Sequence, residues 1–241
     1  MLELKHISWS LPDGKDIIKN ISVKIPEGKL VVITGPNGGG KTSLAKIIAG
    51  IETPTSGSII ADGDDITSLD ITERAKRGIS FAFQQPVRFK GITVRDLLEL
   101  SAGHTLSHPE ICDLLGKVGL CTRDYIDREV DSSLSGGEIK RIEIATVLAR
   151  GTAYSVFDEP EAGIDLWSFT GLISVFEELK GKSDATQIII SHQERILNIA
   201  DEIIVIANGA IKDMGEREKI LPSLLASEKA TGCPVERRNA R

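Results

Sequence analysis

The stretch Gly35-Pro36-Asn37-Gly38-Gly39-Gly40-Lys41-Thr42 decides the fold of this 241-residue chain. It fits the pattern G-x-x-x-x-G-K-[ST], which is typical of the phosphate-binding P-loop. Its four glycines allow a tight backbone curve, so that successive N–H groups can point at a polyphosphate. In that geometry Lys41 can reach the β- and γ-phosphates, and the Thr42 hydroxyl can bind Mg²⁺. The stretch therefore predicts a site for a nucleoside triphosphate and magnesium.

The residues on either side of the loop support this prediction. Residues 30–33 form a short apolar run, as a buried parallel strand requires. After the loop, Leu44, Ile47 and Ile48 are spaced as on one face of a helix. Strand, loop and helix thus follow in the required order, which disfavours the alternative of a glycine-rich turn that binds nothing. The residues predicted to bind the nucleotide here are Gly35, Pro36, Asn37, Gly38, Gly39, Gly40, Lys41, Thr42 and Ser43.

The composition argues against several classes of protein. Hydrophobic residues make up 41% of the chain, but no apolar stretch reaches the roughly 20 residues of a membrane-spanning helix. Residues 1–5 lack the plan of a signal peptide, and the formal net charge of −6 gives no support to nucleic-acid binding. The cysteines, Cys112, Cys121 and Cys233, are spaced too irregularly for a zinc site, and only Cys233, near the basic tail, is of interest. We therefore expect a cytoplasmic protein without direct membrane insertion and without a nucleic-acid partner.

Short β-type segments precede the strand of the P-loop. Residues 2–4 and 21–25 alternate with a period of two, and Pro12-Asp13-Gly14 between them is typical of a turn. A related segment, residues 57–61, follows the first helix and runs into the turn Asp62-Gly63. Together these segments predict a small antiparallel β layer.

The rest of the chain alternates strands with helices. Strands are predicted at residues 78–83, 154–157 and 187–190, with an edge hairpin over 203–211. Helices are predicted around residues 97–100, 109–118, 142–149 and 166–180. This order predicts an α/β fold: a P-loop NTPase core with a mostly parallel sheet, an N-terminal antiparallel β layer and an inserted α-helical subdomain. We expect the core at residues 1–85 and 151–241, and the helical subdomain at residues 86–150.

A second candidate anion site opens the helix that follows Leu134. Ser135, Gly136 and Gly137 would expose backbone N–H groups at the positive end of a helix dipole, which suits a phosphate. The alternative is a plain helix start, in which Ser135 caps the helix and Glu138 completes a capping box. One nucleotide already has the P-loop, so a second phosphate site would imply a second nucleotide or a second subunit.

Polar side chains also stand where predicted core strands end. Asp158 follows an apolar strand and can hold Mg²⁺ beside Thr42, while Glu159 can orient the attacking water or, alternatively, cap the next helix. His192 ends another strand, at the sheet edge where ligands bind in such folds, although a lone histidine is often only structural. Gln84 closes a third strand and can offer its amide oxygen to Mg²⁺ or water. We therefore predict catalytic roles for Glu159, His192 and Gln84.

With these residues assembled, the chain resembles an ABC-type ATPase over nearly its whole length. The segments that carry the resemblance are Gly35–Thr42 (Walker A), Gln84 (Q-loop), Leu134–Glu138 (signature), Tyr154–Asp158 (Walker B), Glu159 (catalytic glutamate), Ala162–Asp165 (D-loop) and His192 (switch histidine). The resemblance implies an ATP hydrolase that uses ATP and Mg²⁺, with Thr42, Gln84 and Asp158 at the metal.

The same resemblance implies an ATP-dependent homodimer. Two copies would enclose two ATP molecules head to tail, so that Ser135, Gly136, Gly137 and Glu138 of one copy face the P-loop of the other. Binding would close the dimer and hydrolysis would release it, moving a partner attached near Gln84 and the helical insertion. The family's usual aromatic contact to adenine falls at Leu11, two residues after Trp9, which leaves adenine recognition open.

Within the family, three stretches look like the ATPase of the SUF iron–sulfur cluster assembly machinery, SufC. They are residues 81–87 (Phe-Ala-Phe-Gln-Gln-Pro-Val), 135–141 (Ser-Gly-Gly-Glu-Ile-Lys-Arg) and 191–197 (Ser-His-Gln-Glu-Arg-Ile-Leu). This likeness implies a SUF-type scaffold protein as partner, driven through a conformational change by ATP. Residues 158–163 read instead like a general ABC segment, so the alternative partner is the transmembrane subunit of an ABC transporter.

Overall fold

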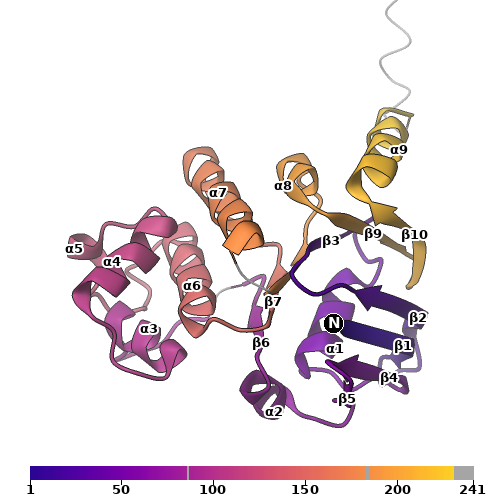
Figure 1. The fold of residues 1–241 in the computed structure, drawn as a ribbon, viewed down its shortest axis with the longest axis horizontal. Helices are drawn as coiled ribbons and strands as arrows, with labels where there is room; N and C mark the ends of the chain where they lie inside the picture. Colours follow the sequence, from indigo (N-terminus) through magenta and orange to yellow (C-terminus); the bar gives the residue numbers. More distant parts are fainter. Residues whose placement is uncertain (86, 183–184, 231–241) are drawn as a thin grey trace, which may run out of the picture.

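The computed structural model describes residues 1–85, 87–182 and 185–230. Two sheets and a separate group of helices make up this part of the chain (Figure 1). Cys233 and the basic tail lie outside the described residues. The strands are β1 Leu2–Ser10, β2 Asp16–Ile25, β3 Leu30–Thr34, β4 Ser56–Ala61, β5 Asp64–Asp65, β6 Ile79–Ala82, β7 Tyr154–Asp158, β8 Thr186–Ile190, β9 Glu202–Ala207 and β10 Ala210–Glu216. The helices are α1 Lys41–Ala49, α2 Ile71–Lys76, α3 Val94–Ala102, α4 His108–Lys117, α5 Thr122–Tyr125, α6 Gly136–Arg150, α7 Leu166–Lys182, α8 Glu194–Ile199 and α9 Arg217–Ala230.

The central sheet has six strands in the order β10-β9-β3-β8-β7-β6. All neighbouring strands are parallel except the β9–β10 hairpin, which confirms the predicted mostly parallel sheet with an edge hairpin. Strands β3, β7 and β8 are buried along their whole length, because helices or the second sheet cover both of their faces. The P-loop follows β3 in the middle of this sheet, and the residues after β7 and β8 lie along the same edge.

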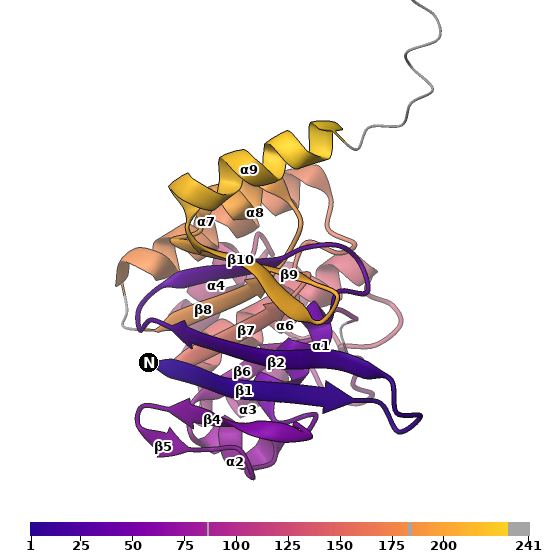
Figure 2. The same ribbon diagram turned by 90° about the vertical axis from the view of Figure 1, so that its right-hand side faces the viewer.

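The second sheet is the predicted antiparallel layer, with the order β2-β1-β4-β5. Figure 2 shows its strands lying across the molecule in front of the central sheet. One hydrophobic cluster joins the inner faces of both sheets to α1, through residues such as Leu4, Ile33 and Leu44. The P-loop helix is therefore packed between the two sheets.

Helices α3, α4, α5 and α6 form a lobe to one side of the sheets (Figure 1). The predicted helices at 97–100, 109–118 and 142–149 correspond to α3, α4 and α6, and the helix at 166–180 to α7. Long α6 packs against α3 and α4 within the lobe and also against β6 of the central sheet. We propose that residues 86–150 form the subdomain expected from the sequence, with α6 as its connection to the core.

The sequence patterns missed several short elements. Helices α2, α5 and α8 have only four to six residues, too few for a hydrophobic period to be visible. Local capping specifies α2 instead, because Asp70 and Glu73 form a complete capping box. Over the described ranges, no helix is both long and apolar enough to cross a membrane.

A buried arginine supports the end of the P-loop helix. Arg74 of α2 is 1% exposed, and its guanidinium donates hydrogen bonds to the carbonyl oxygens of Ile47, Ile48, Thr67 and Leu69. The first two belong to the last turn of α1, where carbonyl groups lack the regular helical partner, although the Gly50 N–H also donates to the Ile47 carbonyl. Arg74 thus caps α1 at the end opposite to the P-loop and fastens it to α2.

We expect Arg74→Ala to lower the free energy of unfolding by about 3 kcal/mol, because it leaves several buried carbonyl groups without donors. Urea denaturation followed by circular dichroism measures the change. Arg77→Ala is the matched control, since Arg77 makes an exposed ion pair with Asp64 and should change stability by less than about 1 kcal/mol. Equal losses in the two variants would show that Arg74 does not have this role.

Candidate functional site

The predicted catalytic residues line one cavity of about 510 Å³. It lies at the edge of the central sheet that carries the P-loop and the ends of β7 and β8. The structure thus brings the P-loop together with three side chains from distant parts of the chain. The residues around the cavity are Lys15, Ile17, Asn37, Gly38, Gly39, Gly40, Lys41, Thr42, Ser43, Gln84, Glu159 and His192.

Lys41 lies inside the loop that it would serve. Its ammonium group donates to the carbonyl oxygens of Gly35 at 2.8 Å and Pro36 at 3.1 Å, and the residue is 6% exposed. Burial lowers the pKa of Lys41, while the carboxylates of Glu159 and Asp158 act in the opposite direction. A buried cation beside open backbone N–H groups favours a multiply charged anion.

Two positions of the loop, Gly35 and Gly39, have no room for a side chain. A Cβ atom on Gly35 would stand 2.1 Å from the carbonyl oxygen of Ile206, and the φ angle of Gly35 is +129°. A Cβ atom on Gly39 would stand 2.9 Å from the same oxygen. The tip of the β9–β10 hairpin closes this contact, because the Gly209 N–H donates to the carbonyl of Gly39 at 3.0 Å. The hairpin therefore packs against the P-loop and supports its curve.

Thr42 and Asp158 meet where the metal is predicted. The Thr42 hydroxyl donates to Asp158 Oδ1 at 3.1 Å, and Asp158 is 1% exposed. Burial raises the pKa of Asp158, whereas the hydrogen bond from Thr42 lowers it. A hydroxyl beside a buried carboxylate is a hard oxygen donor set that fits Mg²⁺, whose other ligands would be phosphate oxygens and water.

Gln84 and Glu159 are in direct contact. Gln84 Nε2 donates to Glu159 Oε2 at 2.6 Å, although the two residues lie 75 positions apart. Glu159 has a φ angle of +45°, a conformation that costs energy for any residue with a side chain. Its N–H donates to the carbonyl of Ile190 in β8, which holds the strained turn in place. The turn presents the carboxylate to the cavity, as expected for a residue that orients water.

His192 lines the cavity from the segment after β8, and Glu161 anchors that segment. The Ser191 hydroxyl donates to Glu161 Oε1 and accepts the N–H of Gln193. Burial raises the pKa of Glu161, and the hydrogen bond from Ser191 opposes this. The sequence analysis assigned no role to Glu161. Its position two residues after Glu159 could have indicated that it lies near the site. We propose that Glu161 fixes the approach of His192.

Ser135, Gly136, Gly137 and Glu138 do not line the cavity of their own chain. Gly136 instead borders a separate hollow with Gln85, Arg88 and Ile139. The capping-box alternative is confirmed, since Ser135 and Glu138 each accept the backbone N–H of the other. Glu138 also accepts a hydrogen bond from the Tyr125 hydroxyl, and these bonds lower its pKa to about 2. The second anion site stays a prediction, to which the capping box adds a structural role.

The question that Leu11 and Trp9 left open, how adenine is recognised, concerns the residues at the rim of the cavity. Leu11 follows the end of β1, and neither it nor Trp9 borders the cavity. Lys15 and Ile17 do, because the turn after Leu11 leads the chain back as β2 towards the P-loop. The sequence analysis missed both residues, because the sequence of a turn does not indicate which of its flanking residues lie near the P-loop.

The chain is similar to known proteins over most of its length. Residues 18–162 match the sequence profile of the ABC transporter family, and the chain belongs to that family. An uncharacterised ABC transporter ATP-binding protein of Methanocaldococcus jannaschii is 37% identical over 215 residues, which are 86% of each chain. The energy-coupling factor transporter ATP-binding protein EcfA1 of Mesomycoplasma hyopneumoniae strain 7448 is 34% identical over 95% of this chain and 86% of its own.

A solved structure supports the fold. The chain resembles a dimeric ATP-binding cassette described in a post-hydrolysis state with ADP and Pi, with a TM-score of 0.82 and 24% identity. The similarity covers 90% of this chain and 99% of that one. The chain is thus an ABC-type ATPase, an ATP hydrolase that uses ATP and Mg²⁺, as the sequence predicted. The likeness to the SUF ATPase is not supported, because both of these relatives are described as transporter ATP-binding proteins.

Proposed function

We propose that this protein is the ATP-binding subunit of a membrane ABC transporter, and that two copies close head to tail around two ATP molecules. The observation that carries the shared site is the separation of Gly136 from the cavity of its own P-loop. The helix start at Ser135 can then serve a nucleotide only from a second subunit. The descriptions of the relatives support the transporter over the SUF scaffold as the driven partner.

The residues of the cavity support a division of work in hydrolysis. Lys41 and the loop N–H groups bind the phosphates, and Thr42, Asp158 and Gln84 would hold Mg²⁺, which neutralises charge on the phosphates. Glu159 accepts a proton from the attacking water, whose oxygen forms the new bond to the γ-phosphorus as the bond to the β–γ bridging oxygen breaks. His192 donates to a γ-phosphate oxygen. The products are ADP and phosphate.

The cavity wall formed by Ile17 supports a proposal for adenine. Ile17 is partly exposed and offers an aliphatic surface beside Lys15. We infer that the base lies against Ile17 by apolar contact, with Lys15 near the ribose or phosphates. This placement answers the question that Leu11, at the family's usual aromatic position, left open.

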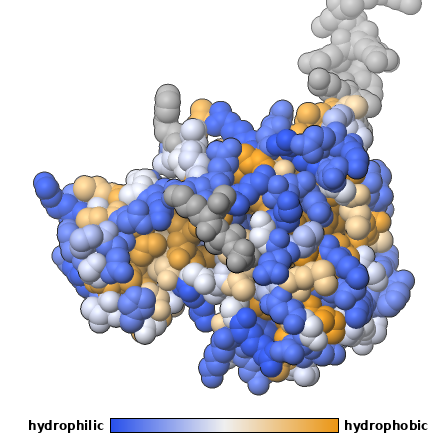
Figure 3. Space-filling model, viewed as in Figure 1, coloured by the Kyte–Doolittle hydropathy of each residue, from blue (hydrophilic) through white to orange (hydrophobic). Residues whose placement is uncertain are grey.

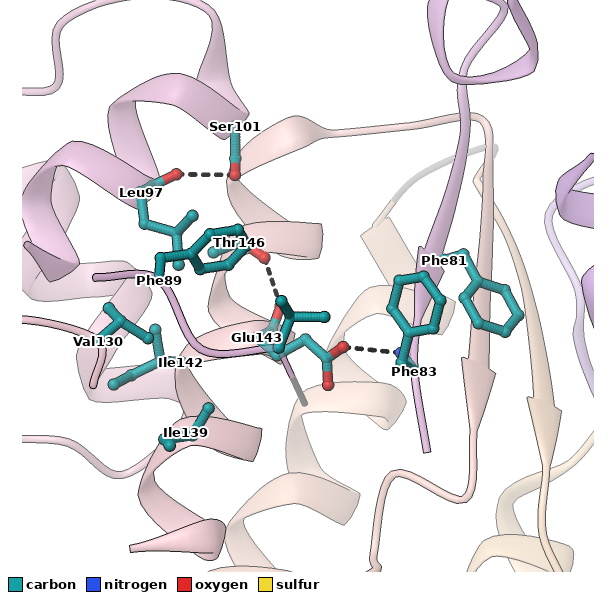
Figure 4. A pocket seen from close by; sticks show the side chains of 11 residues that line it. Phe81, Phe83, Phe89, Leu97, Ser101, Val130, Ile139, Ile142, Glu143 and Thr146 are labelled. Atoms are coloured by element: carbon teal, nitrogen blue, oxygen red, sulfur yellow. Dashed lines mark hydrogen bonds between the residues drawn. The ribbon is translucent and has the colours of Figure 1, made fainter. Parts of the chain in front are cut away.

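A second, more apolar pocket of about 210 Å³ supports a docking place for the partner. Aromatic and aliphatic side chains line it, at the junction of the central sheet and the helical lobe (Figure 4). On the face shown in Figure 3, hydrophobic surface gathers between the lobe and the rest of the molecule. Val87 at this pocket is 46% exposed, although it is a large apolar residue. We propose that a helix of the transmembrane subunit inserts an apolar side chain here.

Affinity purification of the protein from membranes solubilised in mild detergent tests the choice of partner. We expect a polytopic membrane protein to co-purify, and Phe89→Asp at the pocket to abolish its capture without changing the ATPase rate of the isolated subunit. Recovery of a soluble scaffold that carries iron–sulfur clusters would contradict the transporter proposal.

A further inference from the structure

Two charged residues of α6 hold the backbone that leads to Gln84. Lys140 is fully buried, and its ammonium group donates to the carbonyl oxygen of Phe83 and lies 3.1 Å from Glu143 Oε2. Glu143 Oε1 accepts the N–H of Phe83 at 2.7 Å (Figure 4). The ion pair thus holds both polar groups of one peptide residue, just after β6 ends.

Stability alone is a poor reason for this arrangement. Burial raises the pKa of Glu143, while Lys140 and the Phe83 N–H act in the opposite direction. Buried ion pairs are often no more stabilising than apolar residues of similar size. Apolar residues at both positions would continue the surface formed by Ile139 and Ile142 on the same helix. Packing alone therefore does not explain why these two positions carry charges.

The bonds continue from the ion pair to the catalytic site. Gln84 follows Phe83 directly and donates to Glu159 Oε2 at 2.6 Å. A displacement of α6 relative to the sheet would move Phe83 through two hydrogen bonds, and Gln84 with it. Glu143 and Phe83 also line the apolar pocket beside the lobe, so an occupant of that pocket would contact the same residues.

We propose that Lys140 and Glu143 are positioning residues for ATP hydrolysis, which fix Gln84 against Glu159 and make its position depend on the helical lobe. The pair contacts neither the phosphates nor the water and acts through Gln84. The further step, that a docked partner shifts Gln84 through the pair, rests on the proposed function. The positioning role does not, because it applies to the isolated subunit.

The experiment compares Lys140→Met/Glu143→Leu with wild type by steady-state phosphate release. Replacing both charges avoids an unpaired buried ion, so the variant should fold, which thermal unfolding checks. We expect kcat to fall about tenfold with the KM for ATP unchanged, because a misplaced group impairs the chemical step more than binding. The pair Asp113–Lys117 of α4, in which Asp113 is exposed and Lys117 half-buried, gives the control, since Asp113→Asn/Lys117→Met should leave kcat unchanged.

A third variant separates positioning from a general structural role. If the pair acts through Gln84, adding Lys140→Met/Glu143→Leu to Gln84→Ala should cause no further loss of kcat. The proposal would be overturned if the combined variant lost kcat by the product of the two separate losses. An unchanged kcat in the Lys140→Met/Glu143→Leu variant would overturn it as well. Should that variant fail to fold, Glu143→Asp keeps the charge and shortens the reach, and the same comparison with Gln84→Ala applies. Loss of partner binding with normal kcat would affect the proposed function only.

Discussion

Glu159→Gln should retain ATP binding, accumulate as an ATP-bound dimer and lose turnover by about 100-fold or more. The amide can still accept the hydrogen bond from Gln84 that Glu159 accepts at 2.6 Å, so the cavity should keep its shape. It cannot accept a proton from water, however, because an amide has almost no basicity. Its neutral charge also removes a carboxylate that would repel the γ-phosphate. Binding is therefore expected to stay equal or to become tighter while chemistry stops.

Three measurements check this result on one preparation: nucleotide affinity, phosphate release, and size-exclusion chromatography with and without MgATP. Glu177→Gln is the matched control, because Glu177 is an exposed glutamate of α7. Unchanged turnover in Glu159→Gln would remove Glu159 from the mechanism. A slow variant that stays monomeric with bound ATP would leave Glu159 in place and contradict the closed dimer.

Mixing two inactive variants should restore activity if the site is shared. Lys41→Ala disables the P-loop side, and Gly136→Asp places a negative charge at the opposite helix start. A Cβ atom on Gly136 meets nothing within 4 Å, and an acidic residue in the first turn of a helix is favourable, so Gly136→Asp should fold normally. In a mixed dimer one shared site carries both defects and the other carries none.

Each variant alone should lose nearly all turnover, since every one of its sites is defective. An equal mixture that exchanges subunits freely has half of its dimers mixed, each with one intact site, so the phosphate-release rate should recover to about one quarter of wild type. Mixing Lys41→Ala with Glu159→Gln is the control, because both residues lie on the P-loop side and no intact site can form. No recovery in the first mixture would contradict the head-to-tail arrangement.

The parts of the fold that follow from sequence are those set by local chemistry. The P-loop glycines, the apolar strands and the long helix α6 all leave patterns within a few residues, and each was predicted. The contact of Gln84 with Glu159 could not be predicted, because it joins residues that follow two strands, β6 and β7, whose order in the sheet is a property of the whole fold. The ends of parallel strands did indicate that both residues face one edge.

The sequence analysis missed several residues for one common reason, which is that distant parts of the chain decide their surroundings. Lys15 and Ile17 reach the cavity through the return of a hairpin, and Lys140 and Glu143 read as ordinary polar positions of a helix. Their burial is decided by which element packs above them. Nothing within α6 indicates that Lys140 is fully buried. The Phe83 carbonyl that accepts its hydrogen bond lies 57 positions earlier in the sequence.

The support that Ile206 and Gly209 give to the P-loop sets a lower bound on the size of an autonomous nucleotide-binding fragment. The family profile covers only residues 18–162, and a polypeptide trimmed to that span would lose β8 and β9, the two neighbours of β3. Gly35 and Gly39 would then face solvent. The contacts with Ile206 and Gly209 that fix the curve of the P-loop backbone would be lost. Anyone dissecting this protein into pieces should therefore cut beyond the β9–β10 hairpin.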